Sequence, residues 1–165
     1  MKQLVTTIFL LFLTIHFSQA QITTYKGQAL FIYNFTKHIK WQTSPTIFTI
    51  GVYGKSDIIS ELNATLKGKQ IEGKAIQVII IASVADVAQC QLVFLPGNKS
   101  RELSNILGAT NAKDILIVTE HDLTEKGAAI SFVTVEEKLR FRINEAALSK
   151  AGLQVSGGLL SLALR

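Results

Sequence analysis

Apolar residues recur along the chain with two alternating periods. In "GQALFIYNFTKHIKWQ" (27–42) large apolar residues lie four positions apart, which predicts a helix with a wide aromatic stripe. The next run, "TIFTIGVY" (46–53), is rich in β-branched residues and predicts a strand. "SDIISELNATLKGK" (56–69) returns to helical spacing and begins with a serine or aspartate cap. The order is therefore helix, strand, helix.

Three further apolar runs predict strands separated by helices. "AIQVIIIAS" (75–83) is apolar without interruption, which is typical of a strand buried on both faces. "QLVFLP" (91–96) and "ILIVTE" (115–120) are shorter runs of the same kind. "VADVAQ" predicts a short helix before them, and "SRELSNILGAT" (100–110) predicts a longer helix between them. Such alternation indicates a parallel sheet.

The pattern changes in the last third of the chain. "AAISFVTVEEKLRFRIN" (128–144) predicts a β-hairpin around a Glu136-Glu137-Lys138 turn. "NEAALSKAG" (144–152) predicts a capped helix that ends at Gly152, and "SGGLLSLALR" predicts a final apolar helix. The fold expected is α/β, with three layers: a mostly parallel sheet flanked by helices, with an antiparallel hairpin at one edge.

The N-terminus has the pattern of a signal peptide. A basic start at Lys2 precedes the uncharged run "LVTTIFLLFLTIHF", and Ser18 and Ala20 are small residues at the −3 and −1 positions of a cleavage site. The alternative is a transmembrane anchor, but the run is shorter than the roughly 20 residues that span a bilayer. We therefore expect residues 1–20 to be cleaved, residues 21–165 to form one domain, and the product to be exported.

Composition excludes some classes of protein. The chain is 48% hydrophobic and 18% charged, which indicates a folded domain. Without Lys2, 16 basic residues face 12 acidic ones, and no basic stripe with interleaved aromatics indicates a nucleic-acid partner. A net charge of +4 fits weak attraction to an acidic partner or an anionic membrane face. Cys90, the one cysteine, cannot close an internal disulfide, and its apolar neighbours indicate a buried thiol; a catalytic thiolate or an intermolecular bridge stays open.

One short stretch resembles a nucleotide-binding loop. Gly54, Lys55 and Ser56 follow a predicted strand and precede a helix. The Walker A pattern needs another glycine at position 49, where this chain has Thr49, and the connection is too short to wrap a triphosphate. What remains is a helix N-terminus that can receive an anion, with Gly51 and Gly54 expected in a tight strand-to-helix turn.

Polar side chains also follow the strand at 115–120. Glu120, His121, Asp122 and Glu125 lie where open α/β sheets place ligands. A metal or acid–base site is one interpretation and a solvated polar loop is the other, which we favour because no second histidine has ligand spacing. No G-x-S-x-G elbow is present either. We expect no enzymatic activity, metal or cofactor.

A cation–aromatic cluster occupies the end of the first predicted helix. His38 lies between Lys37, Lys40 and Trp41. The cluster could recognise a ligand or partner. The alternative is a helix end at which the lysines complement the helix dipole while Trp41 packs inward.

Two stretches carry a family resemblance. "KGQALFIYNFTKHIKWQ" and "LRFRINEAALSKAGLQVSGGLLSLA" resemble the motifs that bracket the YfiR family of small periplasmic proteins, and the intervening chain is similar to that family in the same order. The resemblance implies a dimeric, non-enzymatic periplasmic regulator. Such a regulator binds the periplasmic sensor domain of an inner-membrane diguanylate cyclase and represses it, which lowers cyclic-di-GMP output and biofilm formation. It also implies control by disulfides, from which this chain departs because it has only Cys90.

The resemblance supplies one set of residues, and the sequence patterns described above supply a second set that overlaps it. Those that match family motifs, most of them expected to be structural, are Tyr33, Asn34, Phe35, Lys37, Trp41, Phe141, Asn144, Gly152, Leu153 and Ser156. Candidates for contact with a partner or ligand are Lys37, His38, Trp41, Gly54, Lys55, Ser56 and His121.

Three functions remain open on this basis. The first is a periplasmic regulator of a membrane signalling protein, which needs an exposed apolar patch, from the first helix or from "LLSLALR". The second is a small-molecule-binding module that feeds a sensor or transporter through a crevice near residues 51–56 and His121. The third, a hydrolase around Glu120, His121 and Asp122, is the least favoured.

Overall fold

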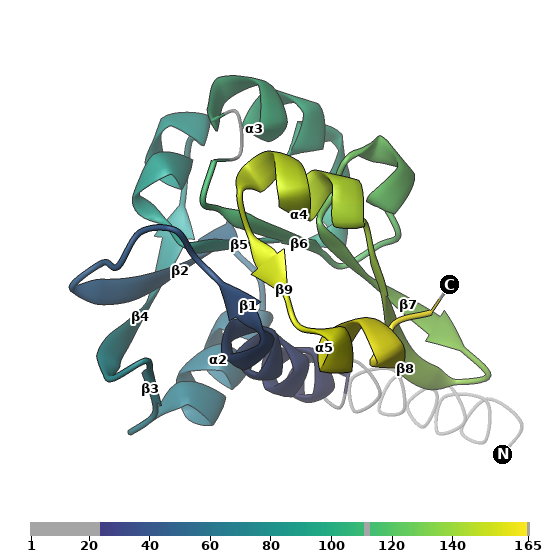
Figure 1. The fold of residues 1–165 in the computed structure, drawn as a ribbon, viewed down its shortest axis with the longest axis horizontal. Coiled ribbons are helices and arrows are strands. Elements are labelled where there is room, and N and C mark those ends of the chain that lie inside the picture. The colour runs from purple at the N-terminus through teal and green to yellow at the C-terminus, as the bar shows by residue number, and fades with distance from the viewer. Residues whose placement is uncertain (1–23, 111–112, 165) are drawn as a thin grey trace, which may run out of the picture.

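The computed structural model describes residues 24–110 and 113–164, which form a seven-stranded sheet with helices on both faces (Figure 1). The expected signal peptide, residues 1–20, lies outside the described residues. The elements in chain order are the first helix (24–38), β1 (Ile39–Lys40), β2 (Ile47–Tyr53), α2 (Ile58–Leu66), β3 (Gln70–Ile71), β4 (Lys74–Ile81), the 3-10 helix η1 (Val84–Gln89), β5 (Leu92–Leu95), the 3-10 helix η2 (Gly97–Glu102), α3 (Leu103–Thr110), β6 (Leu116–Thr119), the 3-10 helix η3 (Thr124–Lys126), β7 (Ile130–Val135), β8 (Lys138–Ile143), α4 (Glu145–Ala151), β9 (Gln154–Val155) and α5 (Gly157–Leu162).

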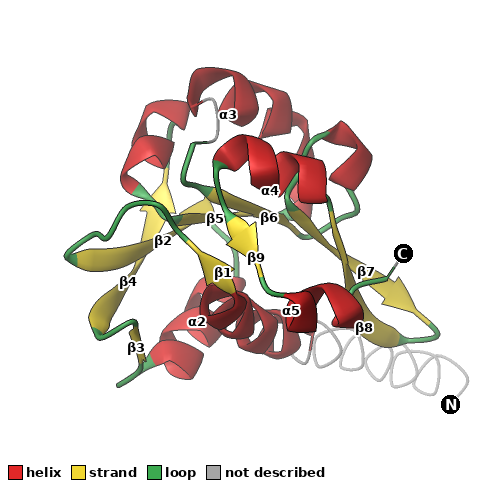
Figure 2. Cartoon of the chain, in the orientation of Figure 1, coloured by secondary structure: helices red, strands yellow, loops and turns green. Residues whose placement is uncertain are grey.

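The sheet has the order β3-β4-β2-β5-β6-β7-β8. The five strands from β4 to β7 are parallel, and β3 and β8 add antiparallel edges (Figure 2). The hairpin β7–β8 turns at Glu136 and Glu137, whose φ values of +48° and +59° are those of a two-residue turn matched to strand twist. The predicted α/β class, with a mostly parallel sheet and an antiparallel hairpin at one edge, is confirmed.

The central strands bury both faces, as their uninterrupted apolar runs predict. Ile50 and Phe94 pack in one core cluster together with the first helix and α2, whereas Val93 and Ile117 pack in a second cluster with α3. Figure 1 shows the first helix and α2 on one side of the sheet and α3 on the other. A sheet covered in this way needs crossover helices between parallel strands, which the alternating sequence pattern supplies.

The first helix is held on the sheet by aromatic rings. Phe35 is fully buried, and its ring centroid lies 5.0 Å from that of Phe141 and 5.8 Å from that of Phe132. The helix ends at His38, earlier than predicted, and Ile39 continues in β1, paired with Val155 of β9. The prediction of a helix was wrong there because Ile39 and Lys40 form backbone hydrogen bonds with a strand near the C-terminus.

The expectation that residues 75–83 form a strand buried on both faces is wrong. β4 lies next to the edge, and β3 covers it only at Lys74 and Ala75. Of the strand's isoleucines only Ile81 is fully buried, and Ile80 is 53% exposed. An apolar run predicts a strand of a parallel sheet, but the same run fits a central strand and a strand near the edge.

The turn between β2 and α2 also differs in detail. Gly51 lies inside β2 and not in the turn; a Cβ there would meet the side chain of Ile81 and come within 2.7 Å of Cys90 Sγ. Gly54 does make the turn, with φ +81°. Asp57 precedes α2 without a side-chain cap. The connection therefore consists of residues 54–57.

No helix within residues 24–110 and 113–164 combines the length and the apolar character that crossing a bilayer requires.

Candidate functional site

A crevice lies where the sheet changes winding direction. From β2 the chain passes through α2 to β4 on one side, then returns to β5 on the other side of β2. In open α/β sheets, ligands bind at such a point, outside the carboxyl ends of the strands. A hollow of about 450 Å³ occupies this place. It is lined by Tyr25, Lys55, Ser56, Asp57, Pro96, Gly97, Asn98, Glu120 and His121.

The first wall is the loop after β2. The left-handed Gly54 donates its N–H to Ile81 O at 2.8 Å, which ties the loop to the end of β4. The side chain of Lys99 crosses Gly54 so closely that a Cβ would come within 3.1 Å of Lys99 Cε. The positive φ of Gly54 therefore favours glycine at this position, and Lys99 lies over it. Lys99 and the exposed Lys55 bring two cations to this loop.

The second wall consists of the loops after β5 and β6. Glu120 accepts a 2.6 Å hydrogen bond from Gly97 N, which joins the two loops. The ring of His121 lies against Gly97, where any Cβ would overlap it. Thr119 donates to His121 O at 2.8 Å and shares a buried 2.7 Å hydrogen bond with Ser131. These bonds fix the backbone from which His121 projects.

A second hollow, of about 430 Å³, adjoins the crevice and shares Glu120 and His121 with it. Gln28, from the first helix, lines this hollow and is only 2% exposed, and its Oε1 has no hydrogen-bond partner within the described chain. Ser56 Oγ, which is also buried, likewise has no hydrogen-bond partner within the described chain. Buried polar atoms are usually paired, so two unpaired oxygens mark this end of the sheet as unusual.

The geometry favours binding over acid–base catalysis. Both carboxylates next to His121 are engaged elsewhere: Glu120 with Gly97 N, and Asp122 with Arg142 at 3.2 Å and Thr124 at 2.7 Å. Neither orients the imidazole as a general base would require. Within the described residues, no three His, Cys, Asp or Glu side chains gather as ligands for a cation. The crevice offers charges of both signs to a polar molecule.

The other candidate residues lie elsewhere, where the end of the first helix meets the C-terminal segment. β1 and β9 pair in a small antiparallel sheet beside α5 (Figure 2). Ser156 N donates to His38 O at 2.9 Å, and Ser156 Oγ lies 3.2 Å from His38 Nδ1. The structure thus joins the two sequence motifs into one unit. Tyr25, which lines the crevice, and Lys37, near the end of the first helix, are twelve residues apart, a rise of about 18 Å along the helix axis.

Two aromatic residues of the first motif make specific contacts. Trp41 donates its indole N–H to Gln91 O at 3.0 Å and packs edge-on against Phe48 at 4.9 Å. Lys37 Nζ lies 4.1 Å from the centroid of the Tyr33 ring. Trp41 therefore anchors the chain after β1, whereas the exposed Lys37 is available at the surface.

The second motif builds α4 and α5. Asn144 Oδ1 accepts from Ala147 N at 2.9 Å and caps α4, which ends at the left-handed Gly152. Leu153 is buried, and Ser156 Oγ accepts from Leu159 N and caps α5. Of the other motif residues, Asn34 is exposed and Phe141 is buried in the aromatic cluster. Asn144, Gly152, Leu153, Ser156 and Phe141 therefore have clear roles in the fold.

Cys90 is a buried thiol. It is 1% exposed, packed in the cluster under η1 and α3. Burial first, and the nearby Asp86 carboxylate second, raise the pKa of the thiol to about 12. A protonated thiol is a poor nucleophile, so the raised pKa argues against a catalytic thiolate. Burial of the sulfur argues against a disulfide with a second chain.

A comparison with protein families matches residues 25–164 to the family described as YfiR/HmsC-like. The chain belongs to the YfiR/HmsC-like family. The match runs from the first helix to Leu164 and so includes both bracketing motifs and the crevice. YfiR/HmsC-like proteins are regulators in cyclic-di-GMP signalling that act through partner proteins. A search of curated proteins finds no match to this chain.

The sequence prediction missed several residues of this region, among them Gly97, Lys99 and Gln28. Gly97 and Lys99 follow a strand in "PGNK", and a turn signal at the carboxyl end of a parallel strand could have identified them. Gln28 had no such signal, because one glutamine in an apolar helix face is not distinctive. Lys55, Ser56 and His121 were identified separately, and the structure brings them to one crevice.

Proposed function

We propose that this YfiR/HmsC-like protein is a non-enzymatic periplasmic regulator. It binds the periplasmic sensor domain of an inner-membrane signalling protein, expected to be a diguanylate cyclase, and represses it. The observation that supports this proposal is the family match, which spans residues 25–164. Export by cleavage of residues 1–20 is part of the proposal.

Repression of this kind needs a surface and no reactive residue. A regulator that binds the inactive state of its partner more tightly than the active state shifts the population toward the inactive state. α5 offers an anchored surface of this kind. Leu159 is buried beneath it, and the Ser156 cap fixes its start. Leu162 stands out from it and, at 64%, is the most exposed of the large apolar side chains within the described residues.

A membrane pull-down tests the proposal. The bait is the chain 21–165, and proteins retained from detergent-solubilised envelope membranes are identified by mass spectrometry. Leu162→Glu is compared with Val135→Glu, which places the same charge at another exposed apolar position, 43% exposed, on β7. Exposed substitutions change the free energy of unfolding by only about 0.5 kcal/mol, so both variants are expected to fold.

The expected result is retention of one membrane protein with a periplasmic domain and a cytoplasmic signalling output. Leu162→Glu is expected to lose that protein, and Val135→Glu to keep it. Retention of no such protein would refute the regulator proposal. Equal retention by both variants would leave the regulator but move its docking surface away from α5.

The exposed edge of β4 supports a homodimer as part of the proposal. Beyond Ala75, no described strand pairs with the outer edge of β4, whose sequence "IQVIII" contains neither proline nor charge. Natural edge strands are normally protected by such residues, and an unprotected edge can pair with a second copy. Ile80→Lys is expected to convert a dimer into a monomer in size-exclusion chromatography with light scattering. A wild-type chain that is monomeric at high concentration would exclude the dimer.

The crevice supports a second candidate function, a small-molecule-binding module that feeds a sensor or transporter. The observation in its favour is that Lys55, Ser56 and His121 line one hollow at the winding change of the sheet. A thermal-shift screen with small carboxylates, phosphates and sugars tests it. A hit should raise the melting temperature of the wild type and not that of Lys55→Ala with His121→Ala. A screen without hits would argue against this function.

A further inference from the structure

Lysines gather on one side of the molecule, partly on a segment of the chain that carries no acids. Residues 24–56 contain no aspartate or glutamate. On the first helix, Lys26, Leu30 and Lys37 are exposed at positions four and eleven residues apart, which is the spacing of one helix face. The opposite face of the same helix is largely apolar and packs on the sheet. The exposed lysines are therefore not needed to hold the helix in place.

The loop between α2 and β3 extends this surface. Lys69 Nζ lies 4.5 Å from the centroid of the Tyr33 ring, which Lys37 Nζ approaches to 4.1 Å, so two ammonium groups share one ring. Lys67 is exposed in the same loop. We call Lys26, Lys37, Lys67 and Lys69, with Leu30, the lysine face.

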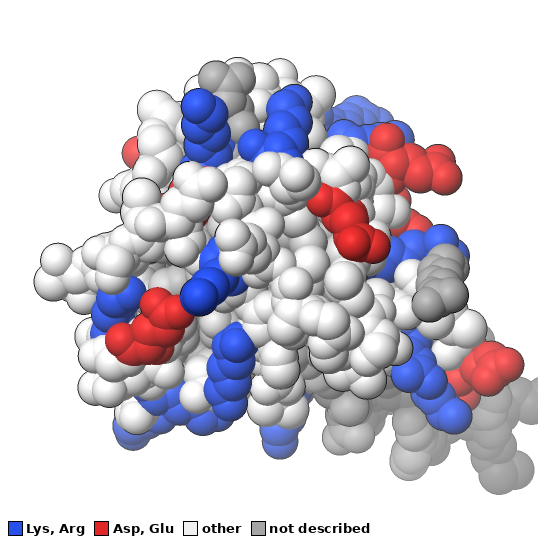
Figure 3. Space-filling model, in the orientation of Figure 1, with Lys and Arg blue, Asp and Glu red and all other residues white. Residues whose placement is uncertain are grey.

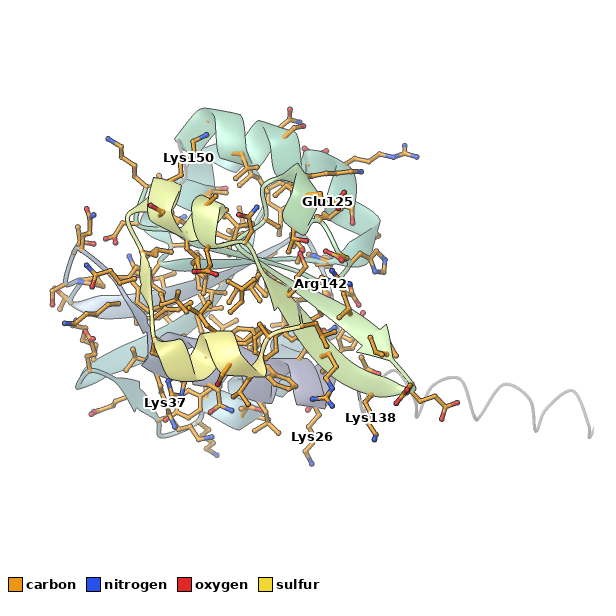
Figure 4. The ribbon with its side chains drawn as sticks, turned by 45° about the vertical axis from the view of Figure 1, so that its right-hand side comes forward. Lys26, Lys37, Glu125, Lys138, Arg142 and Lys150 are labelled. Atoms are coloured by element: carbon orange, nitrogen blue, oxygen red, sulfur yellow. The ribbon has the colours of Figure 1, made fainter. Side chains whose placement is uncertain are left out.

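Within residues 24–110 and 113–164, no lysine of the lysine face takes part in an ion pair. The ion pairs of the described chain join Lys74 to Glu72 and Arg142 to Asp122, and neither includes a residue of this face. Blue side chains line the lower border of the molecule in Figure 3, beneath the first helix and α2. Figure 4 shows Lys26 and Lys37 on that side and Lys150 on the opposite side of the molecule. Uncompensated like charges at one ring repel each other, and an external anionic partner would relieve the repulsion.

The composition of the face indicates what kind of partner. All its cations are lysines, and the four arginines of the chain lie at residue 101 and beyond. Arginine suits defined, bidentate contacts with another protein, whereas lysine is a flexible point charge. Leu30, 46% exposed between Lys26 and Lys37, adds an apolar side chain to a basic helix face. A cluster of exposed lysines is attracted to an anionic membrane surface, and the exposed Leu30 adds an apolar contact.

We propose that the lysine face docks this protein on an anionic phospholipid surface. The first helix then lies along the headgroups, with Leu30 toward the acyl chains and the four lysines among the phosphates. The proposal goes beyond the regulatory function and does not require it, because the binding is to lipid. It would concentrate the protein at the membrane in which the proposed partner resides.

Vesicle co-sedimentation tests the proposal. The chain 21–165 is mixed with vesicles of phosphatidylglycerol and phosphatidylcholine, and separately with phosphatidylcholine alone. The face variant carries Lys26→Gln, Lys37→Gln and Lys69→Gln. The matched control carries Lys113→Gln, Lys126→Gln and Lys150→Gln, three exposed lysines outside the face that give the same change of net charge. Circular dichroism confirms that both variants are folded.

We expect binding to the anionic vesicles only. Each lysine near an anionic surface contributes about a fivefold factor in partitioning, so the face variant should bind on the order of a hundredfold more weakly than the wild type at low salt. Raising the salt concentration should weaken wild-type binding as the charges are screened. The control should lose far less than the face variant.

Three results would overturn the proposal. The first is equal loss of binding in the face variant and the control, which would mean that net charge alone governs binding. The second is binding to phosphatidylcholine alone as strong as to the anionic vesicles. The third is unchanged vesicle binding by the face variant together with loss of the membrane protein in the pull-down, which would assign the face to an acidic protein partner.

Discussion

Asn144 joins two parts of the fold, so its replacement gives a prediction with a calculable size. Its Oδ1 accepts from Ala147 N at 2.9 Å at the start of α4, and its Nδ2 donates to Thr124 O at 2.8 Å in η3. Asn144→Ala removes both bonds and leaves an amide and a carbonyl without their partners. The side chain is half-buried, so water can replace only part of what is lost.

The two losses can be estimated separately. Removing an N-cap side chain costs about 1 kcal/mol of stability. Losing the bond to Thr124 O costs about another 1 kcal/mol, the usual net contribution of an intramolecular hydrogen bond. Asn144→Ala should therefore lower the free energy of unfolding by about 2 kcal/mol. For a domain of this size that corresponds to a fall in melting temperature of roughly 4–8 °C.

Urea denaturation followed by circular dichroism measures the change, and Asn144→Asp separates the two bonds. Aspartate keeps the acceptor for Ala147 N, and its negative charge suits a helix N-terminus, but it cannot donate to Thr124 O. It should lose about 1 kcal/mol, half the loss of Asn144→Ala. A change below about 0.5 kcal/mol for Asn144→Ala would refute the assignment of Asn144 as a structural residue of the family motif.

Other positions give predictions of different sign and origin. Phe35→Ala removes a fully buried ring from the aromatic cluster and should cost about 3–5 kcal/mol in urea denaturation; a loss under 1 kcal/mol would contradict the packing described. Gly51→Ala should destabilise by about 1–3 kcal/mol through its overlap with Ile81, whereas Gly108→Ala, with open space around its Cβ, should be neutral or stabilising. Cys90 should resist a thiol reagent at pH 8 until the protein unfolds, since burial raises its pKa to about 12. Because the folded state holds that proton longer than the unfolded state, stability should fall between pH 9 and 12, and less steeply in Cys90→Ala.

The sequence identified residues of the crevice as candidates without showing that they meet. Lys55 and Ser56 were identified by a glycine turn after a strand, and His121 by polar residues after another strand. Their meeting depends on β5 lying beside β2 with β6 next, an order that no local pattern encodes. The contact of His121 with Gly97 and the bond from Gly97 N to Glu120 likewise follow from strand order.

The joining of the two motifs was outside the reach of local patterns for the same reason. Helical periodicity extended the first helix through Ile39, and the terminal apolar run indicated a helix only. The pairing of Ile39 with Val155 connects residues more than a hundred positions apart. Such a contact closes a long loop and forms only when the whole chain folds. The residues near Ile39 therefore carry no local pattern that predicts it.

The sequence alone determined the longer helices and strands, because these depend on neighbouring residues: the period of apolar positions, the Asn144 cap, the left-handed Gly152 and the turn at Glu136 and Glu137. It also determined the α/β class, because strands that alternate with helices can cover both faces of a parallel sheet. The tertiary structure decided which strand lies at the edge, which loops form the crevice and which lysines share a surface. Those properties depend on contacts between distant segments. The apolar sequence of β4, for example, is compatible with a central strand and with a strand near the edge.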